Sequence, residues 1–251
     1  MIEVRVSQEP ALSRAAADLL IAALPVDRPP VLGVATGSSP LGLYRELGVR
    51  VRAGSASFAE ARAFMLDEYV GLPAGHPESY RAVVGREVGA RLGIDDGSLH
   101  GPDGSAADLE AECARYERAI GDAGGVDMQV LGLGENGHIA FNEPGSPLES
   151  RTRPVELSLG TRRANARFFG GDVDAVPTHA LTQGVATILG ARQILVLAIG
   201  AAKAEAVRQL VEGTESLAWP ATALHRHACV TLLVDPAAAA LLGDSSPTSV
   251  H

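Results

Sequence analysis

The chain has 251 residues and a formal net charge of -9, with 21 Lys and Arg against 30 Asp and Glu. An acidic chain without a basic tract is a poor partner for nucleic acid, and no apolar run reaches the about 18 residues that a membrane span needs. Cys113 and Cys229 lack the spacing of a disulfide framework or a zinc site, so we expect a cytoplasmic protein with no metal, no nucleic-acid partner and no membrane association.

Short apolar runs of strand length alternate with helical patterns along the chain. Continuous apolar strands that alternate with helices are typical of a parallel sheet covered on both faces. We therefore predict a doubly wound α/β domain that spans residues 1–243, followed by a flexible tail at 244–251. The expected strands are residues 1–6, 29–35, 61–66, 126–134, 192–200 and 227–235, and the expected helices are 11–24, 41–47, 201–213 and 236–243.

One long segment does not follow this alternation. Residues 145–177 contain few regular apolar repeats and are rich in Arg, Ser, Thr and Asn. Long irregular insertions in compact domains are often functional lids, and we predict a lid at roughly residues 157–177. In an open parallel sheet, ligands bind beyond the carboxyl ends of the strands, where the chemically richest stretches of this chain fall.

The stretch "ATGSSPLGLY" follows the second expected strand. Its pattern predicts a helix with Ser39 as N-cap and Pro40 as first residue. Backbone N–H groups, the hydroxyls of this loop and a helix N-terminus can hold a phosphate, although an ordinary strand-to-helix turn fits the pattern too. The stretch matches neither a Walker P-loop nor a GxGxxG fingerprint, so ATP and dinucleotide cofactors are not expected.

Asp67 stands at the end of the third expected strand, in "FMLDEYVGL". A carboxylate beside a pocket is a candidate general base, because partial burial raises its pKa toward neutrality. A turn or helix-capping Asp is the alternative.

The stretch "GLGENGHIAFNEP" follows the fourth expected strand and contains His138, which can exchange protons near neutral pH. Glycines on both sides allow a ligand to approach the backbone closely. Glu143, five residues further on, can hydrogen-bond the imidazole and raise its pKa. A purely structural histidine is the alternative.

Lys203 and the arginines of "TRRANARFF" are candidate anion ligands. Lys203 is expected in the first turn of a helix, where the helix dipole disfavours a cation. An anion in the crevice would compensate, and a mobile segment with Arg162, Arg163 and Arg167 could close on a phosphate. Solvated surface cations remain the alternative for all four.

The motifs "LDEYVGL", "HPESY", "GLGENGHIAFNEP", "SRTR" and "ANARFF" occur together and in order. With them, the chain resembles the glucosamine-6-phosphate deaminase family over nearly its whole length. The resemblance implies a Rossmann-like three-layer α/β/α domain with a mainly parallel sheet and a lid. It also implies a cofactor-independent hydrolase of amino-sugar catabolism, which isomerises and deaminates glucosamine 6-phosphate to fructose 6-phosphate and ammonia.

The same resemblance implies roles for the residues that match the motifs. Asp67 matches the base that moves a proton between C2 and C1 of the opened sugar. His138 matches the group that assists ring opening, with Glu143 as its carboxylate partner and Asn136 beside it. The expected phosphate ligands are Thr36, Gly37, Ser38, Ser39, Arg167 and Lys203.

Two departures from the family pattern have consequences. Asn136 stands where some members have an Asp that orients the histidine. Arg153 matches an intersubunit allosteric site for N-acetylglucosamine 6-phosphate, but Val155 replaces the lysine of that site, and the chain ends early relative to those forms. We therefore do not expect this activation, while a homo-oligomer remains possible.

Two other enzyme functions and a sensor are alternatives. A 6-phosphogluconolactonase shares the fold, but a Thr-Ala-Ser-Leu-Phe-Pro type of sequence typically follows its Gly-His, whereas "IAFNEP" follows here. A deaminase for the galactosamine epimer stays open, because one hydroxyl is read by pocket geometry. A non-catalytic sugar-phosphate sensor would not need Asp67, His138 and Glu143 together.

Overall fold

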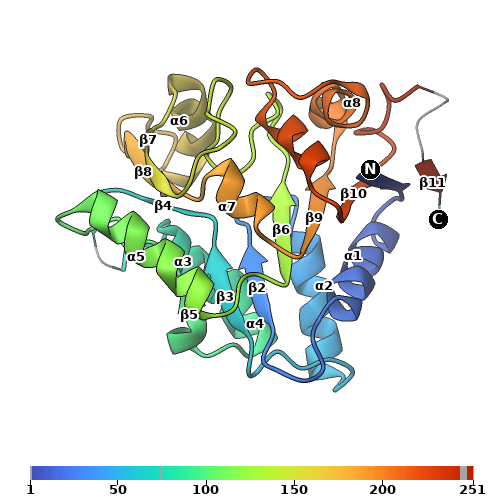
Figure 1. Cartoon of the computed structure of the whole chain (residues 1–251), viewed down its shortest axis with the longest axis horizontal. Coiled ribbons are helices and arrows are strands. Elements are labelled where there is room, and N and C mark those ends of the chain that lie inside the picture. Colours follow the sequence, from blue (N-terminus) through green and yellow to red (C-terminus); the bar gives the residue numbers. More distant parts are fainter. Residues whose placement is uncertain (1, 74, 244–247, 251) are drawn as a thin grey trace.

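The computed structural model of the chain describes residues 2–73, 75–243 and 248–250. Its central sheet has eight parallel strands in the order β11-β1-β10-β9-β6-β2-β3-β5. Helices flank the sheet (Figure 1), which confirms the predicted α/β fold with a mainly parallel sheet. The strands of this sheet are β1 (Ile2–Val6), β2 (Val31–Val34), β3 (Arg62–Met65), β5 (Leu99–His100), β6 (Met128–Gly132), β9 (Gln193–Ala198), β10 (Val230–Val234) and β11 (Thr248–Val250).

The helices connect these strands or cover the site. The α-helices are α1 (Ala11–Ala22), α2 (Leu41–Arg52), α3 (Tyr80–Val84), α4 (Ala90–Leu92), α5 (Leu109–Asp122), α6 (Leu159–Asn165), α7 (Val185–Leu189) and α8 (Ala204–Glu212). The segment η1 (Gly85–Gly89) is a π-helix. The 3₁₀ helices are η2 (Asp96–Ser98), η3 (Ala166–Phe168), η4 (Ala201–Lys203) and η5 (Pro220–Arg226). Within the described ranges, no helix has both the length and the apolarity to cross a bilayer.

The strand order creates a crevice at the carboxyl ends of β2 and β6. These strands are neighbours, but the chain leaves β2 for β3 on one side and leaves β6 for β9 on the other. Right-handed crossovers then place α1 and α2 on one face of the sheet and α5 and α8 on the opposite face. Ligands bind at such a topological switch point, and the loops after β2 and β6 are the two polar stretches predicted to meet there.

A second sheet lies beyond this crevice and was not predicted. It pairs β4 (Asp67–Tyr69) and β7 (Arg153–Glu156) antiparallel with β8 (His179–Thr182). In Figure 1 it forms one end of the molecule together with α6. Gln183 fixes the junction between the two sheets, since its amide Nε2 donates to Met65 O at 3.0 Å and its backbone N donates to Leu66 O at 2.7 Å. Asp67 therefore begins β4 directly after this junction.

The core explains why the switch point is rigid. All four residues of β2 are buried, as the continuous apolar run predicts for a parallel strand. Tyr44 of α2 is 2% exposed, and its hydroxyl pairs with both the N–H and the carbonyl of Ala35. At the opposite end of the sheet, Asp127 accepts from Val31 N at 2.9 Å and pairs with Arg28 and Arg192.

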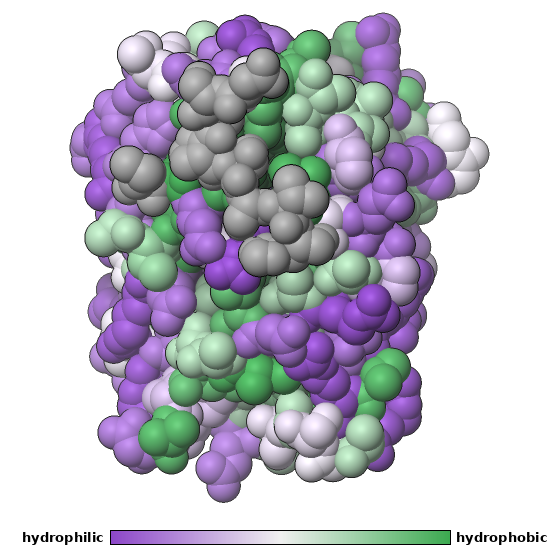
Figure 2. All heavy atoms as spheres, turned by 90° about the vertical axis from the view of Figure 1, so that its right-hand side faces the viewer, coloured by the Kyte–Doolittle hydropathy of each residue, from purple (hydrophilic) through white to green (hydrophobic). Residues whose placement is uncertain are grey.

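The chain's carboxyl-terminal strand lies at one edge of the sheet. The predicted flexible tail covers residues 244–251, of which 244–247 and 251 lie outside the described residues. Thr248–Val250 pair with β1 as strand β11, which the sequence pattern does not predict. Figure 2 shows this side of the molecule, where hydrophilic and hydrophobic side chains are interspersed.

Candidate active site

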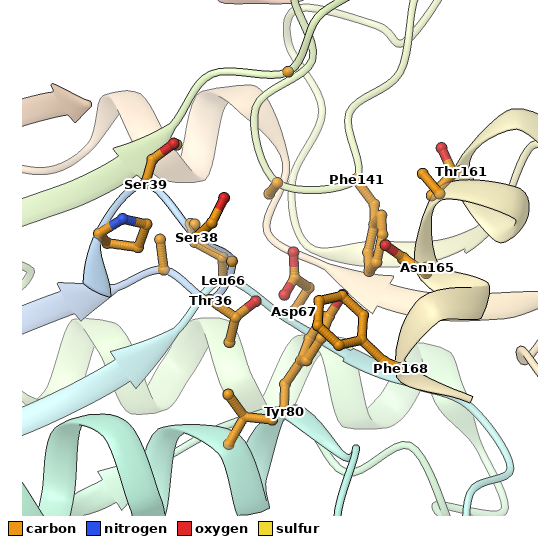
Figure 3. Close-up of a pocket in the computed structure, with 18 of the residues that line it drawn as sticks. Thr36, Ser38, Ser39, Leu66, Asp67, Tyr80, Phe141, Thr161, Asn165 and Phe168 are labelled. Atoms are coloured by element: carbon orange, nitrogen blue, oxygen red, sulfur yellow. The ribbon is translucent and has the colours of Figure 1, made fainter. Parts of the chain in front are cut away.

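A cavity of about 820 Å³ opens at the switch point between the two sheets. The loops after β2, β3 and β6 line it, together with α6, η3 and Lys203. All the predicted site residues except Glu143 belong to this lining. In Figure 3, Thr36, Ser38 and Ser39 lie on one side of the cavity, Thr161, Asn165 and Phe168 lie on the other, and the Asp67 carboxylate lies between them.

The loop after β2 presents hydroxyls and a helix N-terminus to the cavity. Gly37 has φ 95°, a conformation that glycine adopts without strain. The predicted N-cap is wrong by one residue: Pro40 is the N-cap, α2 begins at Leu41, and no side chain caps the helix. Because Pro fixes φ near the helical value, it can close the turn itself. The Ser39 hydroxyl therefore remains available to a ligand.

Asp67 is the buried carboxylate of the cavity. Its residue is 6% exposed, and within the described part of the chain its carboxylate accepts no hydrogen bond. Burial, and secondly the charge of Glu68, raise the pKa of Asp67 to about 8. A carboxylate with such a pKa takes and returns protons readily near neutral pH.

Glu68 has the opposite surroundings although it is the next residue and equally buried. It accepts hydrogen bonds from the backbone N–H groups of Tyr69, Tyr80 and Arg81 at 2.8, 2.9 and 2.8 Å. These bonds attach β4 to the start of α3, and they oppose the burial that raises the pKa of Glu68. Its function in the fold is structural.

The loop after β6 is shaped around His138. A Cβ on Gly134 would lie 2.2 Å from His138 Nδ1, and Gly137 has φ 78° with Trp219 2.6 Å from where its Cβ would be. Ala140 has φ 51°, which a residue with a Cβ rarely adopts. The glycines of the motif are thus required by the placement of this ring, and the loop stores backbone strain beside it.

Asn136 stands between His138 and Glu143. Its Oδ1 lies 2.6 Å from His138 Nδ1, and its Nδ2 donates to Glu143 Oε2 at 2.9 Å. The prediction of a direct contact between the imidazole and Glu143 is therefore wrong, because the amide is the nearer partner. The charge of Glu143 raises the pKa of His138, but burial has the larger effect and lowers it, with a further lowering from Lys203.

The donor and acceptor roles in the hydrogen bonds from Glu143 through Asn136 to His138 determine the tautomer of the ring. An ionised carboxylate only accepts hydrogen bonds, so the amide nitrogen of Asn136 faces Glu143 and its oxygen faces the ring. The Nδ1 atom then carries the proton, and Nε2 of the neutral ring is left with a free lone pair. His138 is thereby prepared to accept a proton at Nε2.

Lys203 and Arg167 bring two positive charges to the cavity. Lys203 is half-buried, and burial lowers its pKa, as does the charge of Arg167, while Glu135 raises it. The Arg167 guanidinium lies 4.7 Å from the ring centre of Phe168. Among the described residues neither cation forms an ion pair, and Lys203 precedes the first residue of α8, at the positive end of the helix dipole. The arrangement favours an anion.

The predicted lid segment forms one wall of the cavity. It contains α6 and η3, and its side chains pack on a second hydrophobic cluster that includes Tyr69 and Phe141. Asn165 Nδ2 donates to the hydroxyl of Tyr69 at 2.9 Å, and His76 stacks on Phe169. The structure shows where this segment lies, and its opening and closing stay a prediction.

Several residues of this wall were not singled out from the sequence. Tyr80 and Phe141 stack beneath the lid with ring centres 5.9 Å apart, and Thr161 contacts Glu143. Tyr80 ends the noted motif "HPESY", Phe141 lies in "GLGENGHIAFNEP" and Thr161 begins "TRRANARFF", but aromatic and hydroxyl side chains in such stretches are usually core or surface residues. The fold brings all three into the lining of one cavity.

These features define an α/β protein whose switch-point cavity contains a buried carboxylate, an imidazole and two cations. The family of glucosamine-6-phosphate isomerases and 6-phosphogluconolactonase matches residues 8–233, and the chain belongs to this family. It is 61% identical over 226 residues to a protein of Beutenbergia cavernae named glucosamine-6-phosphate deaminase, covering 90% of this chain and 87% of that one. The protein of that name from Mycolicibacterium smegmatis is 58% identical over 224 residues, which cover 89% and 86% of the two chains.

Solved structures agree with this family. A structure described as a monomeric glucosamine-6-phosphate deaminase superposes with a TM-score of 0.91 at 43% identity, covering 96% of this chain and all of that one. The 6-phosphogluconolactonase from Trypanosoma cruzi superposes with a TM-score of 0.76 at 21% identity, over 96% and 97% of the chains. The second likeness shows the shared fold alone.

Proposed function

We propose that the protein is a glucosamine-6-phosphate deaminase, which converts glucosamine 6-phosphate to fructose 6-phosphate and ammonia. The observation that carries this proposal is the placement of Asp67 and His138 in one cavity. Asp67 is a buried carboxylate with its pKa raised to about 8, and His138 is held in one tautomer. The identity of 61% to a relative with this name supports the same reaction.

His138 acts first, on the closed sugar. Its free Nε2 accepts the proton of the anomeric hydroxyl while the ring C–O bond breaks, and the imidazolium gives a proton to the ring oxygen. The product is an open aldehyde with an ammonium group on C2. Because the pKa of His138 is lowered by burial, the ring is neutral at pH 7 and ready to accept.

Asp67 acts second, on the open chain. It removes the proton from C2, which is acidic beside the aldehyde and the ammonium group, and returns it to C1 of the resulting enolamine. During this transfer one proton of the ammonium group passes to the aldehyde oxygen, so that the enolamine carries a C1 hydroxyl. The C2 iminium formed by protonation of C1 then adds water and releases ammonia, which leaves the ketose phosphate. The positive amino group of the substrate favours the charged form of Asp67, so the base is ionised in the complex.

The phosphate is held by the loop after β2, by Lys203 and by Arg167, which belongs to the predicted lid segment. Lys203 and Arg167, which form no ion pair with any described residue, supply two cations, and the loop of Thr36, Gly37, Ser38 and Ser39 supplies N–H and hydroxyl donors. A dianion at the start of α2 and α8 meets the positive ends of both helix dipoles. This binding orients C1 and C2 toward Asp67.

The compartment and the assembly follow from the same reaction. A sugar phosphate is charged and does not cross membranes, so a cytoplasmic enzyme has access to its substrate. The relative solved at 43% identity is described as monomeric. This supports activity of a single copy, whether or not the protein forms a homo-oligomer.

An assay with three substrates tests the proposal. Glucosamine 6-phosphate, its galacto epimer and 6-phosphogluconolactone are each supplied, and ammonia, ketose phosphate and loss of the lactone are measured. We expect equal amounts of ammonia and fructose 6-phosphate from glucosamine 6-phosphate, and none from Asp67→Asn. Hydrolysis of the lactone without ammonia release from either amino sugar would contradict the proposal and favour the lactonase.

A further inference from the structure

The lid helix makes direct contact with the carboxylate of the acid/base group. Thr161, in the first turn of α6, donates its hydroxyl to Glu143 Oε1. Ser158 caps the same helix by accepting from Thr161 N at 3.1 Å, and its hydroxyl lies 3.4 Å from Glu143 Oε1. Figure 3 shows Thr161 on the helix at the rim of the cavity.

Glu143 is thus held from two sides by two different oxygens. Thr161 occupies Oε1, while Asn136 occupies Oε2 at 2.9 Å. Since the carboxylate only accepts, both neighbours must donate, and the direction of every hydrogen bond from Thr161 to His138 is determined. A carboxylate held at both oxygens has a fixed plane, which in turn fixes the amide of Asn136.

We propose that Thr161 is a positioning residue through which the docked lid sets the tautomer and orientation of His138. When the Thr161 hydroxyl is removed, Glu143 Oε1 keeps only the longer contact with Ser158 at 3.4 Å, and when the lid is undocked it keeps neither, so that the carboxylate can rotate. The amide of Asn136 then loses its fixed orientation, and His138 loses the partner that holds the proton on Nδ1. This inference rests on the proposed role of His138 in ring opening.

A second contact of the same helix provides a matched control. Asn165, at the end of α6, donates to the hydroxyl of Tyr69 at 2.9 Å. That contact also attaches the lid, but it leads to the aromatic cluster and has no part in the contacts of Glu143. Loss of Asn165 therefore loosens the lid without removing a donor from the carboxylate.

Kinetics of single and double variants test the proposal. Thr161→Val removes the hydroxyl and keeps the shape of the side chain, and we expect kcat to fall by about 10- to 100-fold, the usual scale for a residue that orients another functional group. Thr161→Ser keeps the hydroxyl and should stay within about threefold of the wild type. Combined with Glu143→Ala, Thr161→Val should have no further effect, whereas Asn165→Ala should multiply with Glu143→Ala.

A measurement on the free protein separates positioning from a general loosening of the lid. The ¹⁵N chemical shifts of His138 report which ring nitrogen is protonated, and they are assigned with His138→Gln. We expect the Nδ1–H form in the wild type, Thr161→Ser and Asn165→Ala, and a mixture of tautomers in Thr161→Val. Thr161→Ala provides a second variant without the hydroxyl, should Thr161→Val fail to fold.

The outcomes distinguish this inference from the proposed function. A kcat of Thr161→Val equal to that of the wild type, a multiplicative effect with Glu143→Ala, or an unchanged tautomer would each overturn the role of Thr161. If the wild type releases no ammonia, the proposed function fails. The tautomer of His138 in the free protein would still decide whether Thr161 positions the ring.

Discussion

Asp67 and Glu68 are adjacent buried carboxylates with opposite surroundings. Three backbone N–H groups donate to Glu68, whereas the Asp67 carboxylate faces the cavity without a hydrogen-bond donor among the described residues. The fixed charge of Glu68 helps to raise the pKa of Asp67 to about 8. One carboxylate therefore attaches β4 to α3, while its neighbour remains free to exchange protons.

Replacing the base should stop the reaction and spare binding. We expect Asp67→Asn to lower kcat by at least about 10³-fold, within the range of a general base, because the amide cannot take the C2 proton. Phosphate binding lies elsewhere in the cavity, so the dissociation constant for glucosamine 6-phosphate, measured by calorimetry, should change by less than about tenfold. Near-normal ammonia release would show that Asp67 is not the base.

The same variant should be more stable than the wild type, in a pH-dependent way. The folded state raises the pKa of Asp67 from 3.8 to about 8, so it favours the protonated form. The favourable contribution of Asp67 to the free energy of unfolding is fully present below pH 3.8, decreases as the pH rises, and is lost above about pH 8. Each pKa unit corresponds to about 1.4 kcal/mol, so the ionised carboxylate destabilises the folded state by several kcal/mol.

Thermal unfolding between pH 5 and pH 9 measures this effect. We expect the Tm of Asp67→Asn to exceed that of the wild type by at least about 5 °C at pH 9, and the difference to shrink toward pH 5. Glu68→Gln provides the control: its carboxylate accepts three backbone hydrogen bonds, so its loss should destabilise the protein. A constant difference for Asp67→Asn across this pH range would contradict the raised pKa.

The neutral amide of Asn136 should keep the pKa of His138 low. Asn136→Asp places a negative charge at the position 2.6 Å from His138 Nδ1, and an opposite charge at this distance favours the imidazolium. We expect the acid limb of the pH profile of kcat/KM, and the NMR titration of His138, to move upward by about 1–3 pH units. Asn136→Ala should move neither the acid limb nor the titration of His138 upward. An unshifted titration in Asn136→Asp would contradict the contact between this side chain and the His138 ring.

The sequence predicted the strands and the loops that follow them better than it predicted the wall opposite. The apolar runs of β2, β6 and β9 are buried on both faces, so their pattern identifies them and places the carboxyl-end loops in one crevice. The antiparallel strands β4, β7 and β8 are short and depend on pairing between distant segments. For that reason the contacts of Thr161 and Asn165 required the structure.

The position of Asn136 between His138 and Glu143 could not be predicted from the sequence either. Spacing in the sequence suggested that Glu143 returns to the imidazole, because both belong to one short loop. The left-handed backbone at Gly137 and Ala140 turns the loop so that the amide reaches the ring first. Sequence patterns predict which residues share a loop, whereas the order in which their side chains meet depends on its dihedral angles.

Lys203 should contribute mainly to binding. Hydrogen bonds to charged groups contribute about 1.5–3 kcal/mol, so we expect Lys203→Ala to raise KM by about 10- to 100-fold and to change kcat much less. Lys203→Arg keeps the charge and should bind better than Lys203→Ala. Competitive inhibition by inorganic phosphate should weaken in parallel in Lys203→Ala; if KM and this inhibition are unchanged, Lys203 does not hold the phosphate.

Arg153 is half-buried and donates a hydrogen bond toward the loop of His138, which bears on activation by N-acetylglucosamine 6-phosphate. Its Nη1 donates to Asn142 Oδ1 at 2.9 Å, and Asn142 Nδ2 donates to the carbonyls of Ile139 and Gln183. Burial lowers the pKa of Arg153, and Val155 supplies no charge. One donor of Arg153 thus supports the loop of His138, and without a lysine at position 155 the residue has no second cation beside it in this strand with which to bind an effector phosphate.

Saturation kinetics with and without this effector test that reasoning. We expect a hyperbolic dependence of ammonia release on glucosamine 6-phosphate, and no change when N-acetylglucosamine 6-phosphate is added at concentrations that do not compete at the active site. Arg153→Met should lower the Tm and kcat, because Asn142 loses a donor beside Glu143. If the effector activates the wild type but not Arg153→Met, Arg153 binds the effector. A purely structural Arg153 predicts that the wild type itself shows no activation.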